Sequence, residues 1–561
     1  MSSLDEPLAA GEPAELADVL PGTKWARFEE WLGHLSDRLN PILVKEARQS
    51  LRSRQFAMTF FLMLIAGWVW SILGLALLGP GAYYSAAGQS MFFVYYMILA
   101  APLLIVIPYS AYHSLAIERQ DRTYELVSIT ALDATGILLG KLSGIGLQMM
   151  VYLSALFPCL AFTYLLRGLN LFTVLLVVVY TCLLSLFLSQ VGLFFAAVAP
   201  PQRKPIVQGV VLAALLCFVF FVDISMMSAF MRFDAVDDPE FWEVNLSFAV
   251  LYLNAFAILF LCARTQLTTV NQNRSTALRI ALAVAQLSAV GWFAAAVLRW
   301  GDRHVIYGLI FLSTAAWFLV GMFIVGESPA LSPRVRRDLP KSIPGRIMLS
   351  WLAPGPASGY LFVLGNMIMM AVMAVVMTTP IFEELRNFSG ASSISNPPPS
   401  RRIVPSGEAL EACIVAVSYI AIYLGVGKLI LGAMRRYDEI KPAMRIAVLM
   451  LLLGVGAGAP WIIQLSNPAT RNLGYTPLQI TNAVWTMWEY CAEGSRPPGA
   501  GPVLVTMLPI IALCVWALNL PGLARELRQA RAPTPPRVME DEAELAARAA
   551  VSTEPSSPWD D

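Results

Sequence analysis

The sequence predicts an all-α polytopic membrane protein with about 12 transmembrane helices. Of its 561 residues, 57% are hydrophobic and only 14% are charged, whereas about a quarter of the residues in a soluble domain are charged. The charged residues are segregated, so uncharged runs reach about 20 residues, the length that crosses a bilayer. We predict spans at residues 55–79, 92–117, 142–166, 170–199, 206–230, 245–263, 280–298, 304–325, 358–378, 409–433, 443–463 and 502–520.

The orientation of the spans follows from the distribution of Lys and Arg. Most of the 39 Lys and Arg residues lie in the N-terminal segment, in the C-terminal tail and in the connecting segments on the same side as these two. Cytoplasmic segments carry an excess of these residues. We therefore expect both termini to be cytoplasmic, which agrees with an even number of spans.

The composition excludes several kinds of site and partner. A net charge of +1 gives no basic surface for nucleic acid, so the lipid bilayer is the expected surrounding partner. The three His residues are far apart in the sequence, and the seven Cys residues form no CxxC pair. No metal site is therefore predicted. No cleavable signal peptide is recognisable, and the first span is expected to act as the targeting signal.

Changes in composition divide the chain into five parts. The parts are a flexible N-terminal tail (1–21), amphipathic interfacial or elbow helices (22–54), a six-span domain (55–265), a second six-span domain (266–520) and a cytoplasmic tail (521–561).

The segment before the first span predicts two amphipathic helices. Residues 22–39 place apolar and aromatic residues at helical spacing, and this stripe either lies at the membrane interface or packs on protein. Residues 40–56 begin with Asn-Pro, a typical helix start. This second helix runs directly into a span, so the chain must bend near residue 55, as an elbow. Its charged side is formed by Lys45, Glu46, Arg48 and Arg52.

The loop at 118–141 is the longest charged segment between the early spans. Glu118 ends the second span, where it is either partly buried or an ordinary solvated carboxylate. The sequence YELVSI predicts a short helix with an apolar side, and Asp133 is the expected cap of the next helix. A short, partly apolar helix at a cytoplasmic turn is suited to bind in a groove on a partner protein.

The elbow, the first two spans and this loop together resemble the type 2 permeases of ABC exporters, over about residues 37–265. Two departures from the family pattern are Arg122, where Gly is usual, and Ala131, where Pro is usual. The resemblance implies that 118–141 contains the helix that docks on a separate ATPase, with the contact made by Glu118, Arg119, Thr123, Glu125 and Leu126. The residues that match the family pattern are these five together with Thr130, Leu132, Gly140 and Lys141.

The chain carries no nucleotide site of its own that we can recognise. The stretch GILLGKLSG resembles a phosphate loop, but too few residues separate Gly136 from Gly140, and Leu142 stands where Ser or Thr is needed. We therefore predict a transporter subunit that is not an enzyme, without a cofactor, with ATP and Mg expected in an ABC ATP-binding subunit. The resemblance also implies a bacterial cytoplasmic (inner) membrane.

The second half shows no convincing copy of the elbow and loop. It is either a diverged repeat of the first half or an accessory domain, and we favour the accessory domain. If two coupling loops are required, a second permease chain would complete the pathway as a homodimer or heterodimer.

One carboxylate, Asp223, falls within the fifth predicted span. It is either a functional intramembrane group or a residue near the outer interface. The spans otherwise contain few ionisable residues, which disfavours an ion-coupled carrier. That carrier and a non-transporting membrane scaffold remain the alternative functions.

Overall fold

The fold is all-α, as the sequence predicts. The computed structural model describes residues 41–79, 88–121, 124, 133–166, 168–199, 206–231, 238–269, 272–300, 303–327, 331–337, 342, 344–345, 351–388, 406–435, 442–492, 501–528 and 536–553. These residues form helices and no strand. Among them, 12 helices are long and apolar enough to cross a membrane, and they coincide with the predicted spans. The chain is therefore a multi-pass membrane protein.

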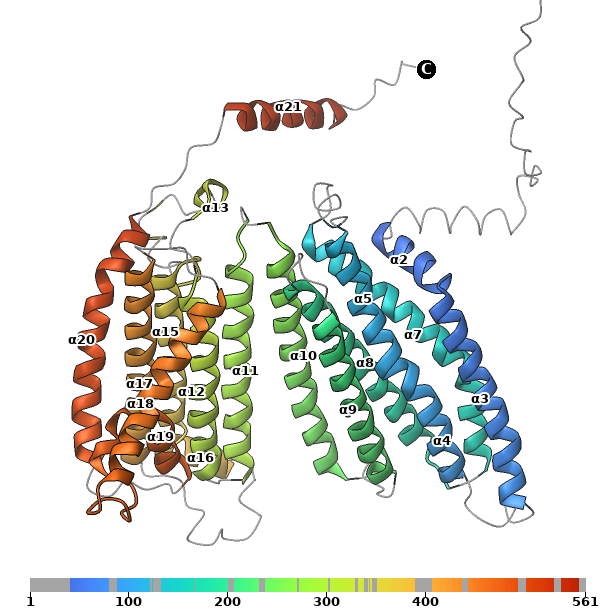
Figure 1. The fold of residues 1–561 in the computed structure, drawn as a ribbon, viewed down its shortest axis with the longest axis horizontal. Helices are drawn as coiled ribbons and strands as arrows, with labels where there is room; N and C mark the ends of the chain where they lie inside the picture. The colour runs from blue at the N-terminus through green and yellow to red at the C-terminus, as the bar shows by residue number, and fades with distance from the viewer. Residues whose placement is uncertain are drawn as a thin grey trace, which may run out of the picture. The chain divides into compact units, whose positions relative to one another are not determined.

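The chain divides into two compact units, Met1–Phe241 and Trp242–Asp561. The domain boundaries predicted from composition stay a prediction. The predicted helix at 22–39 lies outside the described residues. The helices of the first unit are α2 (Pro41–Leu51), α3 (Arg54–Leu78), α4 (Gly88–Ala101), α5 (Ile107–Gln120), α7 (Ala134–Leu165), α8 (Leu171–Val198) and α9 (Ile206–Phe230) (Figure 1).

The predicted elbow is present as α2 followed by α3. The helix breaks at Arg52 and Ser53, slightly earlier than the predicted residue 55. Ser53 has an extended backbone and caps α3, because its side chain accepts a hydrogen bond of 3.1 Å from the Phe56 amide. Capping satisfies one of the amide groups that a helix start leaves free.

The second span is continuous but contains a π-helical segment, Pro102–Val106, between α4 and α5. The Ile107 amide donates a hydrogen bond to the Pro102 carbonyl. In the same π-helical pattern, the Leu103 carbonyl would accept a hydrogen bond from the amide of residue 108. Residue 108 is proline and has no N–H. The Ser185 hydroxyl of α8 donates instead to the Leu103 carbonyl at 2.5 Å. Because unsatisfied backbone groups are costly inside a bilayer, this bond stabilises the irregular turn.

Helices α5 and α8 approach closely at Gly192. A Cβ atom at this position would lie 2.7 Å from the Pro108 carbonyl oxygen and 3.4 Å from the Tyr112 Cβ atom. Small residues allow this kind of close backbone approach between membrane helices. Gly192 therefore fixes the packing of α8 on α5.

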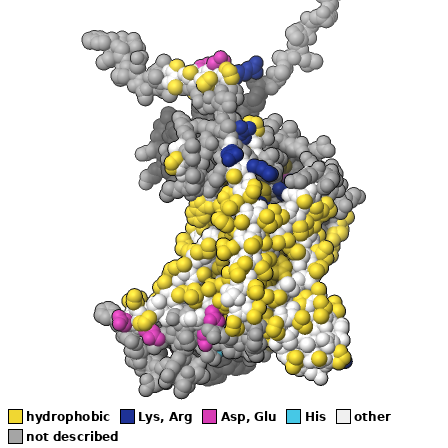
Figure 2. Space-filling model, turned by 90° about the vertical axis from the view of Figure 1, so that its left-hand side faces the viewer, with side chains coloured by type: hydrophobic (Ala, Val, Ile, Leu, Met, Phe, Trp, Pro, Cys, Tyr) yellow, Lys and Arg dark blue, Asp and Glu magenta, His cyan; other side chains and the backbone are white. Residues whose placement is uncertain are grey.

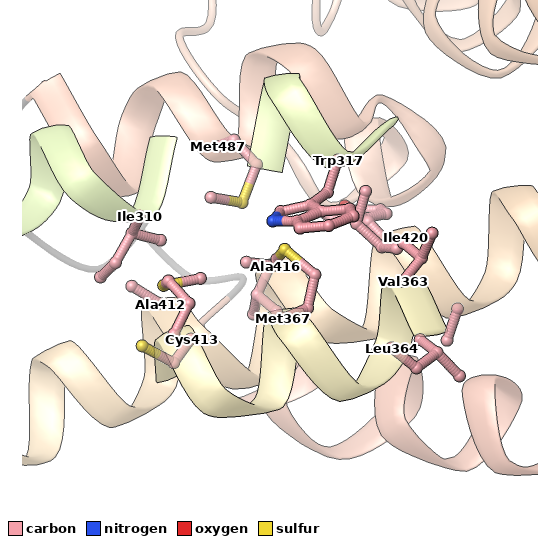
Figure 3. Packing of buried hydrophobic residues seen from close by; sticks show 14 of the residues in the cluster. Ile310, Trp317, Val363, Leu364, Met367, Ala412, Cys413, Ala416, Ile420 and Met487 are labelled. Carbon is pink, nitrogen blue, oxygen red and sulfur yellow. The ribbon is translucent and has the colours of Figure 1, made fainter. Parts of the chain in front are cut away.

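The second unit contains most of α10 (Pro239–Leu267) and the helices that follow it. Its core lies between α12, α15 and α17, where Trp317, Val363, Met367 and Ala416 pack together (Figure 3). The further helices are α11 (Thr276–Trp300), α12 (Arg303–Val325), α13 (Pro333–Arg337), α15 (Pro356–Val376), α16 (Pro380–Phe388), α17 (Ser406–Met434), α18 (Pro442–Ser466), the 3-10 helix η6 (Pro477–Thr481), α19 (Ala483–Ala492), α20 (Gly501–Leu527) and α21 (Pro536–Thr553).

Hydrophobic side chains form a broad band on the face shown in Figure 2, Lys and Arg side chains lie above the band, and Asp and Glu side chains lie both below it and at the top of the view. This is the surface expected of a membrane-spanning unit whose basic end is cytoplasmic.

Candidate functional site

The candidate site is an ion-pair cluster where the elbow helix meets both ends of the predicted loop. At its centre, the Lys141 ammonium group lies 2.7 Å from Glu46 Oε1 and 3.0 Å from Glu118 Oε2. It also donates a hydrogen bond of 2.8 Å to the Ser114 hydroxyl. The Lys141 side chain is only 3% exposed. One cation of α7 therefore holds carboxylates from α2 and α5.

Lys45 adds a second cation at the edge of the cluster. Its ammonium group lies 2.9 Å from Glu118 Oε1, and its side chain is 53% exposed. Burial lowers the pKa of Lys45, but the hydrogen bond that Lys45 donates to Glu118 and the charges of Glu118 and Glu46 outweigh this effect, so the pKa lies above its usual value. Glu118 is therefore a partly buried carboxylate shared by two cations, and not an ordinary solvated carboxylate at the end of the span.

Two local features place Lys141 against the elbow. Asp133 caps α7, as predicted, because its Oδ1 atom accepts a hydrogen bond of 2.8 Å from the Gly136 amide. One turn beyond Lys141, a Cβ atom at Gly144 would lie 3.0 Å from the Glu46 Cβ atom. The absence of a side chain at Gly144 lets α2 approach α7 closely enough for Glu46 to reach the ammonium group.

The remaining predicted contact residues have different positions. Arg119 donates to the carbonyl oxygens of Ala196 (2.9 Å) and Ala197, so its guanidinium group binds the end of α8. The side chains of Arg48 and Arg52 are exposed and lie outside the ion pairs described above. Residues predicted for the docking contact that lie outside the described residues are Thr123, Glu125 and Leu126.

Sequence reasoning assigned no role at the site to Ser114 or Lys141, although Lys141 was part of the family pattern. The available signal was helical spacing, since Ser114 lies one turn before Glu118 on α5.

A cavity of about 210 Å³ opens beside the cluster and is lined in part by Glu46, Ser114 and Lys141. This volume admits several water molecules, at about 30 Å³ each.

The predicted intramembrane carboxylate, Asp223, points into the first unit. Its Oδ2 atom accepts a hydrogen bond of 2.5 Å from the Tyr96 hydroxyl, which lies 3.0 Å from the Thr181 hydroxyl. Tyr96 is fully buried. Helices α4, α8 and α9 are thus joined by two hydrogen bonds of the Tyr96 hydroxyl.

The second unit holds a comparable cluster that sequence reasoning missed. Arg279, at the start of α11, is fully buried, and its Nη2 atom lies 2.7 Å from Glu327 Oε2. The same carboxylate oxygen accepts a hydrogen bond of 2.8 Å from the amide of Gly355, which precedes α15. Glu327 follows α12 and Gly355 precedes α15, so this cluster joins the two ends of the segment between α12 and α15 to α11.

The residues that carry this second arrangement differ from those of the first. The Glu526 carboxylate of α20 adds a cap to α15 by accepting hydrogen bonds from the amides of Ala357 (2.8 Å) and Ser358 (2.9 Å). A Lys and two Glu residues form the first cluster, whereas an Arg, a Glu and backbone groups form the second.

Within the described part of the chain, no group of His, Cys, Asp and Glu is arranged to hold a metal ion. Comparison of the chain with protein-family models, with characterised proteins and with solved structures gave no match.

Proposed function

We propose that this chain is the membrane permease subunit of an ATP-driven ABC exporter in a bacterial cytoplasmic membrane. A separate ATP-binding subunit would dock at 118–141 and move the helices at its two ends. ATP and Mg would be bound by that partner.

The observation that carries the proposal is the ion pair between Glu118 and Lys141. These two residues stand at the two ends of the loop, and both are bound to the elbow helix α2 through Lys45 and Glu46. Because the ends are linked, a displacement of the loop would move α5, α7 and α2 together. A simple connecting loop would not need such a link.

The Arg279–Glu327 cluster of the second unit supports a second coupling site for an ATPase in the same chain. Glu327 and Gly355 stand at the two ends of the segment between α12 and α15, and Arg279 holds them to α11. This arrangement favours a diverged permease repeat over the accessory domain that we preferred from the sequence. A second permease chain would then not be required.

The proposal is tested by establishing whether an ATP-binding subunit is encoded next to this gene and by coexpressing the chain with such a subunit. The double variant Glu125→Arg and Leu126→Asp should abolish copurification of that subunit and ATP-dependent transport in proteoliposomes. Arg48→Glu, also a charge reversal but on the exposed side of α2, is the control and should retain both. Association and transport that survive the double variant would rule out 118–141 as the coupling loop.

Two further outcomes would select the alternative functions. Copurification without transport of any tested substrate, and without a labelled path through the spans, would indicate a membrane scaffold. Transport that requires a proton or sodium gradient and no ATP would indicate an ion-coupled carrier. In that case Asp223, the carboxylate bonded to Tyr96, would be the first residue to replace.

A further inference from the structure

The second unit contains an apolar hollow that borders its core and shares no residue with the proposed coupling site. It has a volume of about 260 Å³ and lies between the spans α12, α17 and α18 and the short helix α19. Phe318, Leu319, Ile420 and Leu453 line it from the three spans, and Met487 lines it from α19. Ile420 and Met487 belong to the core shown in Figure 3, so the hollow borders directly on packed side chains.

The polar atoms in the lining are already bonded within the protein. Tyr419 donates to the Ile480 carbonyl at 2.7 Å, and Tyr423 donates to the Thr481 carbonyl. The Thr314 hydroxyl donates to a carbonyl of its own helix at 2.6 Å. A ligand in this hollow would therefore find apolar contacts and no free donor, which favours a hydrocarbon group over a polar solute.

The hollow adjoins a groove rimmed by tryptophan. Phe311 and Val484 line both the hollow and the groove, and Trp461, Trp485 and Trp488 line the groove. Trp488 is 59% exposed. Trp side chains are enriched where a membrane meets water, and α19 lies at the end of the second unit opposite α13 (Figure 1). The groove therefore lies at the predicted outer interface, and the hollow extends from it toward the membrane interior.

We propose that the hollow binds one acyl chain of a bilayer phospholipid, with the headgroup over the tryptophan rim. Its lining includes Ala315, Leu319 and Val484, whose side chains are exposed on the surface of the unit, and in a membrane this surface faces hydrocarbon. An apolar cavity of about 150 Å³ already stays dry and accepts benzene, so the larger hollow admits a longer apolar group.

The site is held open by the hydrogen bonds that fix α19. Thr486 of α19 lies 2.8 Å from the Tyr475 hydroxyl and 3.1 Å from the Tyr419 hydroxyl. Gln464, near the end of α18, accepts hydrogen bonds from Gln479 at 2.7 Å and from Thr476 at 2.9 Å, both of which lie in the connection before α19. These buried bonds place α19 against the spans without filling the space between them, so the hollow is a built feature of the fold.

The full chain in liposomes of phosphatidylethanolamine and phosphatidylglycerol provides the test. The probe is a phosphatidylcholine with a photoreactive diazirine in one acyl chain, and mass spectrometry locates the adducts. Adducts should concentrate on Leu319 and Val484. Ala315→Trp should fill the hollow and lower their yield about tenfold, because displaced methylene groups lose their apolar burial.

Ala316→Trp is the matched control. Ala316 is the next residue of α12 and is also exposed, but it does not line the hollow, so the adduct yield should be unchanged. Val484→Trp fills the same space from α19 and provides a second variant if Ala315→Trp does not fold. Adducts spread evenly over all exposed spans, or a yield unaffected by both filling variants, would overturn the proposal. The experiment contains no ATPase, so its result is independent of the coupling function.

Discussion

Replacement of Lys141 by Met should destabilise the first unit far more than replacement of Lys45 by Met. Both residues pair with Glu118, but Lys141 is 3% exposed and also binds Glu46. Methionine keeps much of the volume of the lysine stem and removes the charge. The variant therefore leaves two carboxylates next to each other without the cation between them.

The magnitude follows from the geometry. At 2.7 Å and 3.0 Å, each contact contributes an attraction of about 6 kcal/mol at an effective dielectric constant near 20. Desolvation offsets much of this, and removal of one partner from a buried pair costs about 3–5 kcal/mol net. The exposed Lys45 pair should cost only about 0–1 kcal/mol. For a domain of this size, the larger loss lowers the midpoint of thermal unfolding by roughly 10 °C.

The assay is thermal unfolding of the purified chain in detergent, followed by tryptophan fluorescence or by the loss of the monodisperse elution peak. The Lys141→Met variant combined with Glu46→Gln should recover part of the lost stability, because the Glu46 charge that Lys141 no longer neutralises is removed as well. An unfolding midpoint for Lys141→Met no lower than that for Lys45→Met would refute the central role of Lys141.

Four further predictions concern single side chains. Gly192→Ala should lower stability by about 1–3 kcal/mol, because the new Cβ atom meets a backbone carbonyl of α5. Gly146→Ala is the control and should be neutral or slightly stabilising, because its Cβ atom meets nothing within 4 Å. Equal thermal unfolding midpoints for the two variants would contradict this prediction. Gln190→Met should raise stability by about 1–3 kcal/mol, because the buried amide makes no hydrogen bond within the described structure; a lowered midpoint would indicate an unseen partner. Arg279→Met should cost about 3–5 kcal/mol, measured by unfolding of the second unit, and a loss below 1 kcal/mol would be inconsistent with its buried ion pair. Because the pKa of Lys45 is raised in the folded protein, the stability that its charge contributes should persist up to the usual lysine pKa of 10.5 and should be lost as pH rises further. If the difference in unfolding midpoint between the unmodified chain and Lys45→Met vanished near neutral pH, this assignment would be contradicted.

The spans could be predicted almost completely from the sequence. A membrane span must satisfy its backbone internally and face hydrocarbon, so length and apolar composition alone specify it. The elbow was predictable for a similar reason, because its charged side, its Asn-Pro start and its position before a span are all local features. The cap at Asp133 likewise needs only its own helix.

The structured outer connection was not predictable in the same way. The sequence predicted no helix between the spans 443–463 and 502–520, whereas the structure contains η6 and α19 there. These short helices depend on contacts distant in sequence, such as the bond from Tyr419 to the Ile480 carbonyl. A helix of this length has little stability of its own, so tertiary contacts decide whether it forms.

The sequence by itself determined that this chain crosses a membrane many times, that its basic segments share one side, and that a charged loop at 118–141 follows an elbow. These properties depend on local composition and on the energetics of a residue in lipid or water. Only the tertiary structure decided that Lys141 joins Glu46 to Glu118, and that Arg279 and Glu327 form a comparable link in the second unit. Such links depend on which helix ends approach each other, and that is set by the packing of whole helices, for which the charges themselves contain no signal.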